Sequence, residues 1–247
     1  MGVNFYRITI MTKTKNSISP TARISPTAKI GQNCIIQDNV LIHDNVDIGD
    51  NCIIENNVTI GHPTADYYKN DRYQNPTTKI GNGCILRTNS VIYAGVQFSD
   101  RAETATNAVI REYCQVGEQS SIGILTQVQR NTTIGKRVNI RGATHITAEV
   151  LIEDDVFIGA GVILVNDNTM LRPIDAQKGK KTILKAPIIR RGAKIGSNAT
   201  IFPGVEIGEN SIVGAAALVR KNVPSGKVVV GNSDLRILRD VPDDEKI

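Results

Sequence analysis

KIGQNC IIQDNV LIHDNV DIGDNC IIENNV, residues 29–58, is the stretch that decides the fold. It consists of five six-residue units in succession, each with Ile in second place, Asn in fifth place and Cys or Val in sixth place. An amphipathic helix is excluded, because its apolar residues recur about every 3.6 positions whereas these recur every six.

The six-residue unit continues far beyond this stretch. Three blocks, residues 17–64, 79–168 and 188–223, divide into 29 hexamers, and 28 of them carry Ile, Leu, Val or Phe in second place. Sixth place is small in 28, and fifth place is Asn or Gly in 16. Asn and Gly best tolerate the left-handed backbone of a tight turn. A strand and a turn per hexamer predict an all-β parallel β-helix, a three-sided prism of about 9–10 coils and roughly 46 Å in height.

The four cysteines fit this pattern as small fillers of the core. Cys34, Cys52, Cys84 and Cys114 all occupy sixth place of a hexamer. No CxxC pair is present, which argues against a disulfide or a zinc site.

Composition and charge limit the classes of protein to which the chain can belong. The chain has 247 residues, of which only 4% are aromatic and none is Trp, which suits a core of many small layers. The net charge of +5 suits an anionic ligand and equally a plain basic surface. No run of 18 apolar residues predicts a membrane span, and no basic patch with aromatic residues predicts nucleic-acid binding. The first residues lack a signal-peptide apolar region, with Met1 and Met11 as alternative starts, so we expect a cytoplasmic protein.

The repeat divides the chain into an N-terminal extension, residues 1–16, the β-helix, residues 17–223, and a C-terminal cap and tail, residues 224–247. Two insertions, residues 65–78 and 169–187, interrupt the hexamers. They follow the eighth and the twenty-third hexamer, so both leave the prism at the same corner if the phase of three is kept. The separation is five coils, about 24 Å. Long loops in a tight coil are usually functional, and we expect the active site between them.

Several motifs resemble those of a known family. The repeat itself, the run FIGAGVILVNDN (157–168) and the tail IVGAAALVRKNVPSGKVVVGNSDLRI (212–237) resemble the left-handed β-helix, hexapeptide-repeat acyltransferases. GHP (61–63), ILRTNSVIYAGV (85–96) and VIRE (109–112) are similar to the branch that acts on nucleotide-linked amino sugars. The resemblance implies a left-handed prism, a homotrimer with active sites in the grooves between prisms, and acetyl-CoA or a related acyl-CoA as donor, without a metal. It implies N-acetylation of a nucleotide-linked amino sugar for surface glycan synthesis.

One hexamer, ETATNA (103–108), departs from both the repeat and the family. Thr104 replaces the aliphatic residue, and Thr106 stands where many relatives with a VIRE-like motif carry His. An amino sugar is largely an ammonium ion at neutral pH and must lose a proton before it attacks a thioester. Solvent can take that proton, or Glu112, His62 or Asp100 can replace the family's base, or activity is lost. We interpret the break as an adaptation of the site.

The candidate site residues follow from the column positions and the resemblance. Glu112 and His62, predicted two layers and about 10 Å apart, are the catalytic candidates. A plain alternative pairs Glu112 with Arg130 as a surface ion pair. The residues expected to bind the acceptor are Asn89, Thr106, Asn107, Arg111, Tyr93, Asn166 and Asp167, although Asn89 and Asn107 also occupy the turn place. The small and basic residues expected to bind acyl-CoA are Gly142, Ala160, Gly161, Ala215, Ala216, Arg220, Lys221 and Lys227.

Other classes of protein share the prism. A γ-type carbonic anhydrase needs three zinc-binding histidines, but His43, His62 and His145 occupy three different places of their hexamers. A sugar O-acetyltransferase remains the rival within the enzyme class, although a hydroxyl acceptor demands a stronger base. A noncatalytic β-helix scaffold is the rival outside it.

Overall fold

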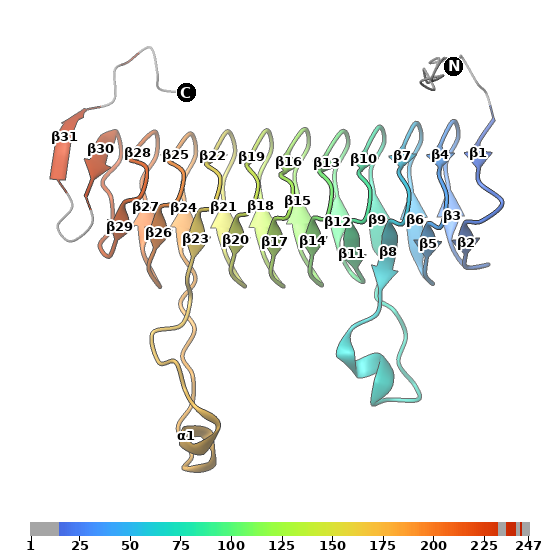
Figure 1. The fold of residues 1–247 in the computed structure, drawn as a ribbon, viewed down its shortest axis with the longest axis horizontal. Coiled ribbons are helices and arrows are strands. Elements are labelled where there is room, and N and C mark those ends of the chain that lie inside the picture. Colours follow the sequence, from blue (N-terminus) through green and yellow to red (C-terminus); the bar gives the residue numbers. More distant parts are fainter. Residues whose placement is uncertain (1–14, 232–235, 241–242, 244–247) are drawn as a thin grey trace, which may run out of the picture.

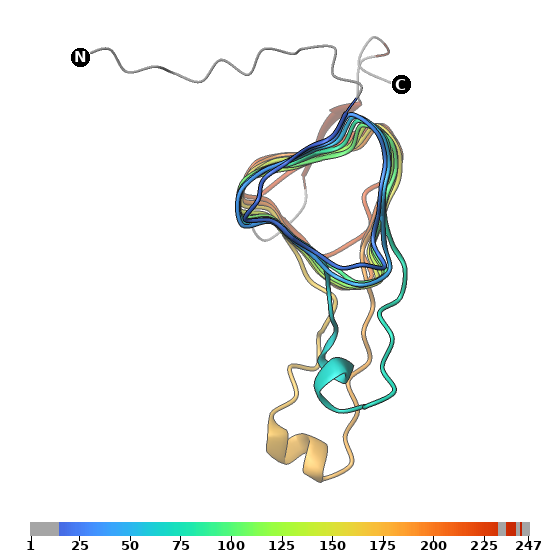
Figure 2. The same cartoon turned by 90° about the vertical axis from the view of Figure 1, so that its right-hand side faces the viewer.

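The chain forms a left-handed parallel β-helix with three flat faces, as Figures 1 and 2 show. The structure, a computed structural model, describes residues 15–231, 236–240 and 243. Each coil gives one short strand to each face, so strands that pair are three apart in the chain: β1 pairs with β4, and β4 with β7. The predicted fold class is confirmed, and the 29 hexamers correspond one to one to strands β1 to β29.

The three faces are three sheets, named here in the order in which the chain enters them. The first sheet contains β1 (Ser17–Ile18), β4 (Ile35–Ile36), β7 (Ile53–Ile54), β10 (Ile85–Leu86), β13 (Glu103–Thr104), β16 (Ser121–Ile122), β19 (Asn139–Ile140), β22 (Phe157–Ile158), β25 (Lys194–Ile195), β28 (Ile212–Val213), β30 (Lys227–Val230) and β31 (Arg236–Asp240). The second sheet contains β2 (Arg23–Ile24), β5 (Leu41–Ile42), β8 (Thr59–His62), β11 (Val91–Tyr93), β14 (Val109–Ile110), β17 (Gln127–Val128), β20 (His145–Ile146), β23 (Ile163–Leu164), β26 (Thr200–Ile201) and β29 (Leu218–Val219). The third sheet contains β3 (Lys29–Ile30), β6 (Val46–Ile48), β9 (Thr78–Ile80), β12 (Gln97–Phe98), β15 (Gln115–Val116), β18 (Thr133–Ile134), β21 (Leu151–Ile152), β24 (Ile188–Ile189) and β27 (Glu206–Ile207).

The core is a stack of identical layers inside the prism. Second-place residues such as Ile36, Ile54 and Ile122 are almost fully buried, and each contributes about 1.5–3 kcal/mol through burial. Sixth-place residues fill the corners between them. All four cysteines are buried there with free thiols, so the prediction that they fill the core is confirmed. Fifth-place residues turn the chain with a positive φ, which Asn89 (61°) and Asn107 (59°) illustrate.

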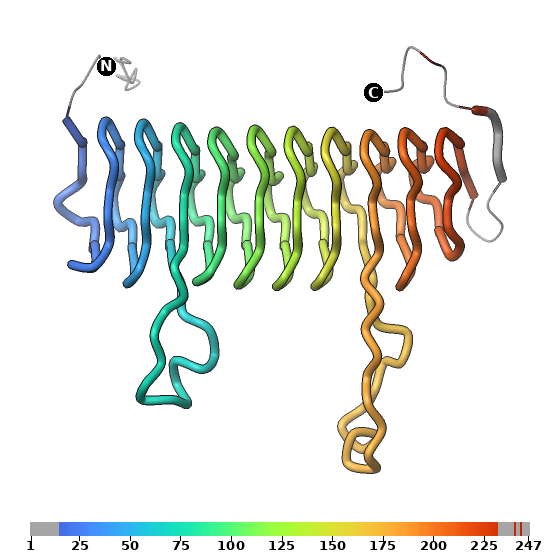
Figure 3. Tube along the Cα trace, turned by 180° about the vertical axis from the view of Figure 1, so that it is seen from behind, coloured from blue at the N-terminus to red at the C-terminus, as the bar shows by residue number. Residues whose placement is uncertain are grey.

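Both insertions leave the same corner of the prism, as the hexamer count predicts. The first connects β8 to β9 and contains the short helix η1 (Ala65–Tyr68), and the second connects β23 to β24 and contains α1 (Pro173–Gln177). Neither shifts the phase, because β6 still pairs with β9 and β21 with β24. Figures 1 and 3 show the two loops projecting on the same side, and β8 and β23 are five steps apart in the second sheet. We call this edge, where the second sheet turns into the third, the loop corner.

Parallel pairing continues beyond β29. Val223 bridges to Ile207 in the third sheet, and β30 pairs with β28 in the first sheet. β31 then returns antiparallel along β30 and closes the C-terminal end. Most of the extension predicted for residues 1–16, including both alternative starts, lies outside the described residues.

Candidate functional site

A bulge in β8 places His62 at the loop corner. Gly61 has φ +75° and is buried, and a Cβ atom on it would lie 2.6 Å from Cγ2 of Val46, so only glycine fits. Because of this extra residue, His62 pairs with Tyr93 of β11 rather than with Ala94, where the hexamer count placed it. His62 therefore joins the outward-facing column of Tyr93 and Arg111.

Four side chains from four successive coils form this column. The His62 ring meets the Tyr93 ring edge to face, with 4.8 Å between centroids, and the His43 ring lies 5.9 Å from His62 on the other side. The Arg111 guanidinium lies over Tyr93, with Cζ 4.9 Å from the ring centroid, in a cation–π contact. The structure thus brings together three of the predicted site residues, His62, Tyr93 and Arg111, and adds His43.

Glu112 completes the cluster as the partner of Arg111. Nε of Arg111 donates to Oε2 of Glu112 over 2.7 Å, and Nη2 donates to Oε1 over 2.9 Å. Glu112 is only 8% exposed, and this bidentate bond occupies both of its oxygens and raises the pKa of Arg111. Glu112 therefore pairs with its neighbour in the chain, not with Arg130, and it holds the guanidinium over Tyr93.

The electrostatics of the cluster favour a neutral His62. Burial lowers the pKa of His62 below its ordinary value near 6.5, and the positive charge of Arg111 lowers it further. An imidazole that is neutral at pH 7 can accept a proton. Of the two catalytic candidates, His62 is free to act as a base, whereas the carboxylate of Glu112 is occupied.

The second loop starts far from this cluster within one chain. Asp167 caps its own turn. Its Oδ1 accepts from the hydroxyl of Thr169 over 2.5 Å and from the backbone N–H of Thr169 over 2.6 Å, and these bonds lower the Asp167 pKa. Asn166 donates from Nδ2 to the carbonyl of Ala148 over 3.2 Å. Both residues lie at the loop corner, but five coils from His62, so they do not form one site with it.

A groove runs along the edge between the first and second sheets, which we call the groove corner. Its volume is about 430 Å³, and it extends from Arg87, which follows β10, across β13, β16 and β19. Thr106 and Gly142, two of the predicted site residues, line it together with Gly123. A Cβ atom on Gly123 would lie 2.4 Å from the backbone of Arg141, so a side chain does not fit there and the floor of the groove is bare backbone.

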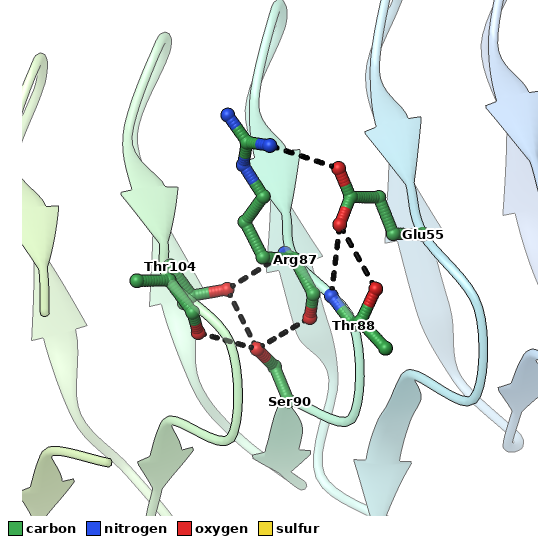
Figure 4. A network of polar contacts seen from close by, with 6 residues as sticks. Glu55, Arg87, Thr88, Ser90 and Thr104 are labelled. Atoms are coloured by element: carbon green, nitrogen blue, oxygen red, sulfur yellow. Dashed lines mark hydrogen bonds and ion pairs between the residues drawn. The ribbon is translucent and has the colours of Figure 1, made fainter. Parts of the chain in front are cut away.

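The irregular residue Thr104 lies beneath this groove and points into the core. It is 1% exposed, and its hydroxyl bonds to that of Ser90 over 3.0 Å. Ser90 also donates to the carbonyls of Arg87 (2.7 Å) and Ala105 (3.1 Å), its alternative acceptors (Figure 4). The buried polar groups are therefore paired, and Thr104 itself does not face a ligand.

Arg87 and Arg141 line the groove and were missed in the sequence. Arg87 is held by Glu55, which it contacts over 3.1 Å and which also accepts from the backbone N–H and hydroxyl of Thr88 (Figure 4). Arg141 lies over the ring of Phe157, with Cζ 5.8 Å from its centroid. Both arginines occupy third place of hexamers in the first sheet. Counting hexamers in the sequence would therefore have placed them on the same face of the prism.

The predicted acyl-CoA residues divide between the two corners. Gly142, Ala160, Gly161, Ala215 and Ala216 all lie along the groove corner, on the coils of β19, β22 and β28. Arg220 and Lys221 follow β29 and lie at the loop corner instead, where Arg220 stacks over Phe202 at 5.3 Å. Lys227 of β30 is paired with Asp240.

The two predicted asparagines lie at turns of the groove corner. Asn89 accepts a hydrogen bond from the side chain of Asn57 over 3.1 Å, as part of a ladder of turn residues. Asn107 occupies the equivalent turn one coil further on and is exposed. Within the described residues, no group of three or more His, Cys, Asp or Glu side chains is arranged to hold a metal ion, and no helix is long and apolar enough to cross a membrane.

Comparisons with known proteins place the repeat in a family. The model for the bacterial transferase hexapeptide (six repeats) matches residues 27–62, and that for the hexapeptide repeat of succinyl-transferase matches residues 188–219. The bifunctional protein GlmU of Rubrobacter xylanophilus is 31% identical over 125 residues, which cover 51% of this chain and 24% of that protein. A serine acetyltransferase of Buchnera aphidicola is 35% identical over 98 residues, which cover 38% of this chain and 36% of that protein. The match therefore spans about a quarter to a third of the length of these relatives.

A solved structure supports the fold over nearly the whole chain. The UDP-N-acetylglucosamine acyltransferase of Arabidopsis superposes with a TM-score of 0.50 over 92% of this chain and 75% of that chain, at 16% sequence identity. At this identity the likeness concerns the fold alone.

Proposed function

This chain belongs to the hexapeptide-repeat proteins of the bacterial transferase type, and on that premise we propose that it is an acetyl-CoA-dependent N-acetyltransferase. The acceptor is the amine of a nucleotide-linked amino sugar destined for surface glycans. The observation that carries this proposal is the half-buried His62, neutral at pH 7 and held beside Tyr93 and Arg111 at the base of the first loop.

His62 supplies the base that the reaction needs. Its imidazole takes a proton from the sugar ammonium, and the free amine attacks the thioester carbonyl. As the new C–N bond forms, the attacking nitrogen gives its second surplus proton to solvent. The C–S bond breaks, and the CoA thiolate leaves with the proton returned from the imidazolium. Glu112 acts through Arg111, which it orients, and is a positioning residue in this scheme.

The groove corner supplies the donor side. Small residues along it leave room for a pantetheine arm to lie against the backbone, and Arg87 and Arg141 give the groove a positive charge that suits phosphates. Within one chain the groove and His62 lie at opposite ends of the second-sheet strands. We therefore propose a homotrimer in which the groove corner of one copy faces the loop corner of the next. This arrangement matches the active sites between neighbouring prisms that the family resemblance implies.

A hydroxyl acceptor is the second candidate, and His62 is the observation that favours it. The threonine at position 106 argued for an amine, because a hydroxyl demands a base, and His62 can provide one. O-acetylation of a sugar therefore uses the same geometry.

The test is release of free thiol from acetyl-CoA in the presence of UDP- and dTDP-linked sugars. The panel contains 2-, 3- and 4-amino sugars, each with its hydroxyl counterpart as the matched control. Release with one amino sugar and not with its hydroxyl counterpart is the expected result. Release only with a hydroxyl sugar would establish the second candidate, and no release together with no CoA binding would indicate a noncatalytic scaffold.

A further inference from the structure

A second cavity lies between the first loop and the wall of the prism. Its volume is about 370 Å³, and it is bounded by Tyr67 and Tyr73 of the loop and by Thr27 and His43 of the coils below. Of the sequence motifs assigned to the site, GHP alone reaches it, through Pro63. It adjoins the His62 cluster directly, because the His43 ring is 5.9 Å from the His62 ring.

The aromatic side of the cavity consists of two tyrosine rings, one held by hydrogen bonds and the other exposed to solvent. The hydroxyl of Tyr73 accepts from the backbone N–H of Thr64 over 3.2 Å and is 3.3 Å from the hydroxyl of the same residue, which anchors the loop. Tyr67 packs edge-on against Tyr73, with centroids 6.0 Å apart, yet it is 56% exposed. An exposed aromatic face braced from behind suits stacking against a planar ring.

The opposite side of the cavity is polar and incompletely paired. Asn75 donates from Nδ2 to the carbonyl of Gly61 over 2.8 Å, but its Oδ1 is buried without a partner. Nε2 of His43 is also buried without a partner. Two of the three unpartnered buried side-chain atoms in the described residues thus belong to residues of this one cavity. Such atoms are costly to leave unpaired, and a ligand with donors on its edge can relieve that cost after a small adjustment of the loop.

The charge of the cavity restricts the ligand. Among the residues that line it, all within the described part of the chain, there is no Lys or Arg, and Asp44 is the one acid. Phosphates are therefore disfavoured inside it, whereas an uncharged polar ring is suited. Thr27, at the far end, belongs to the coil two below His62, about 10 Å along the prism, so the cavity extends away from the general base.

We propose that this cavity binds the nucleobase of the nucleotide-linked acceptor, with the base stacked on Tyr67 and its polar edge toward Asn75 and His43. The inference rests on the proposed function for the identity of the ligand. The adenine of CoA has similar chemistry. We assign the cavity to the acceptor because its His43 lies 5.9 Å from His62, the residue that acts on the acceptor, and the separate titration of CoA tests the other source.

The test measures binding apart from catalysis. UDP, dTDP, CDP, GDP and ADP are each titrated into the full chain by calorimetry, and CoA is titrated separately. Tyr67→Ala should weaken the Kd of the preferred nucleoside diphosphate about tenfold or more, the loss expected when one stacking ring is removed. Tyr67→Phe keeps the ring and should retain the affinity. Met170→Ala, at an exposed residue of the second loop that does not line the cavity, is the control and should bind as the wild type does.

The outcomes separate this inference from the proposed function. Nucleotide binding that depends on Tyr67, without acetyl transfer to any sugar, would support the nucleobase cavity and contradict the transferase. Acetyl transfer whose KM for the acceptor is unchanged by Tyr67→Ala would keep the transferase and overturn the cavity. A Tyr67→Ala effect on CoA alone, or no binding of any nucleoside diphosphate, would also overturn it.

Discussion

The loop corner and the groove corner are built from the same hexamers but carry different chemistry. At the loop corner, an imidazole, a phenol, a guanidinium and a buried carboxylate line up over successive coils. At the groove corner, small residues and hydroxyls form the floor of an open groove flanked by Arg87 and Arg141.

The difference shows how a uniform scaffold makes a site. The interior of every coil must keep the aliphatic and small residues that fill the prism, so the outward residues of first, third and fourth place are the ones free to vary. Each corner can then carry its own chemistry; under the proposed function one serves proton transfer and the other holds a long flexible donor. Under the proposed function, a complete site needs one corner from each of two copies.

The largest expected effect comes from removing the base at the loop corner. His62→Asn should lower kcat by about 10²- to 10⁴-fold, because a positioned general base contributes that much. His145→Gln is the matched control, since His145 also lies on the second sheet and its pKa is also lowered by burial. Steady-state kinetics of thiol release measures both variants. An unchanged kcat for His62→Asn would leave proton removal to solvent and reduce the loop corner to a binding surface.

The pH dependence should change next, and in a definite direction. His62 works as the neutral base, so the rate should rise with pH through a midpoint below 6.5 and level off near neutrality. Arg111→Met removes the positive charge that helps to lower the His62 pKa and leaves Glu112 unpaired. Both changes raise that pKa, so the rising limb should move to higher pH.

The control for this profile is Arg137→Met, which breaks the ion pair with Asp155 on the third sheet, away from the cluster. Its profile should match that of the wild type. If the rising part of the pH–rate profile lies at the same pH for Arg111→Met and for the wild type, Arg111 does not set the protonation of His62.

The smallest expected effect concerns Thr104, beneath the groove corner. Thr104→Val keeps the shape and removes only the hydroxyl, while Ser90 retains a carbonyl acceptor 2.7 Å away. We expect a loss of about 1 kcal/mol or less in the free energy of unfolding and no change in kcat or KM. Chemical denaturation and kinetics check this. A large loss of activity would mean that the irregular hexamer contributes directly to the site.

Most of the fold could be predicted because the hexamer imposes one geometry at each place. Ile36, Ile54 and Ile122 stack because second place always points inward, and the two loops share a corner because the phase of three is kept. β30 could not be predicted in the same way, since the residues after Val223 no longer follow a period of six.

The site was less predictable because it depends on local departures from the repeat. The bulge at Gly61 moved His62 into the row of Tyr93, and a count of sixes does not contain that shift. Glu112 found its partner in the adjacent Arg111, whose side chain folds back over Tyr93, rather than in the layer above. The hydroxyl of Thr104 forms a hydrogen bond with the hydroxyl of Ser90 from the neighbouring coil, and this pairing becomes visible only in three dimensions.

Complementation between two defective copies tests most directly whether the two corners meet in one site. His62→Asn spoils only the loop corner, and Thr106→Arg fills only the groove corner, so each variant alone should be inactive. When the two are refolded together in equal amounts, about three quarters of trimers are mixed and each mixed trimer holds one intact site of three. The account predicts recovery of about a quarter of the wild-type rate of thiol release. A mixture that is no more active than either variant alone would contradict it.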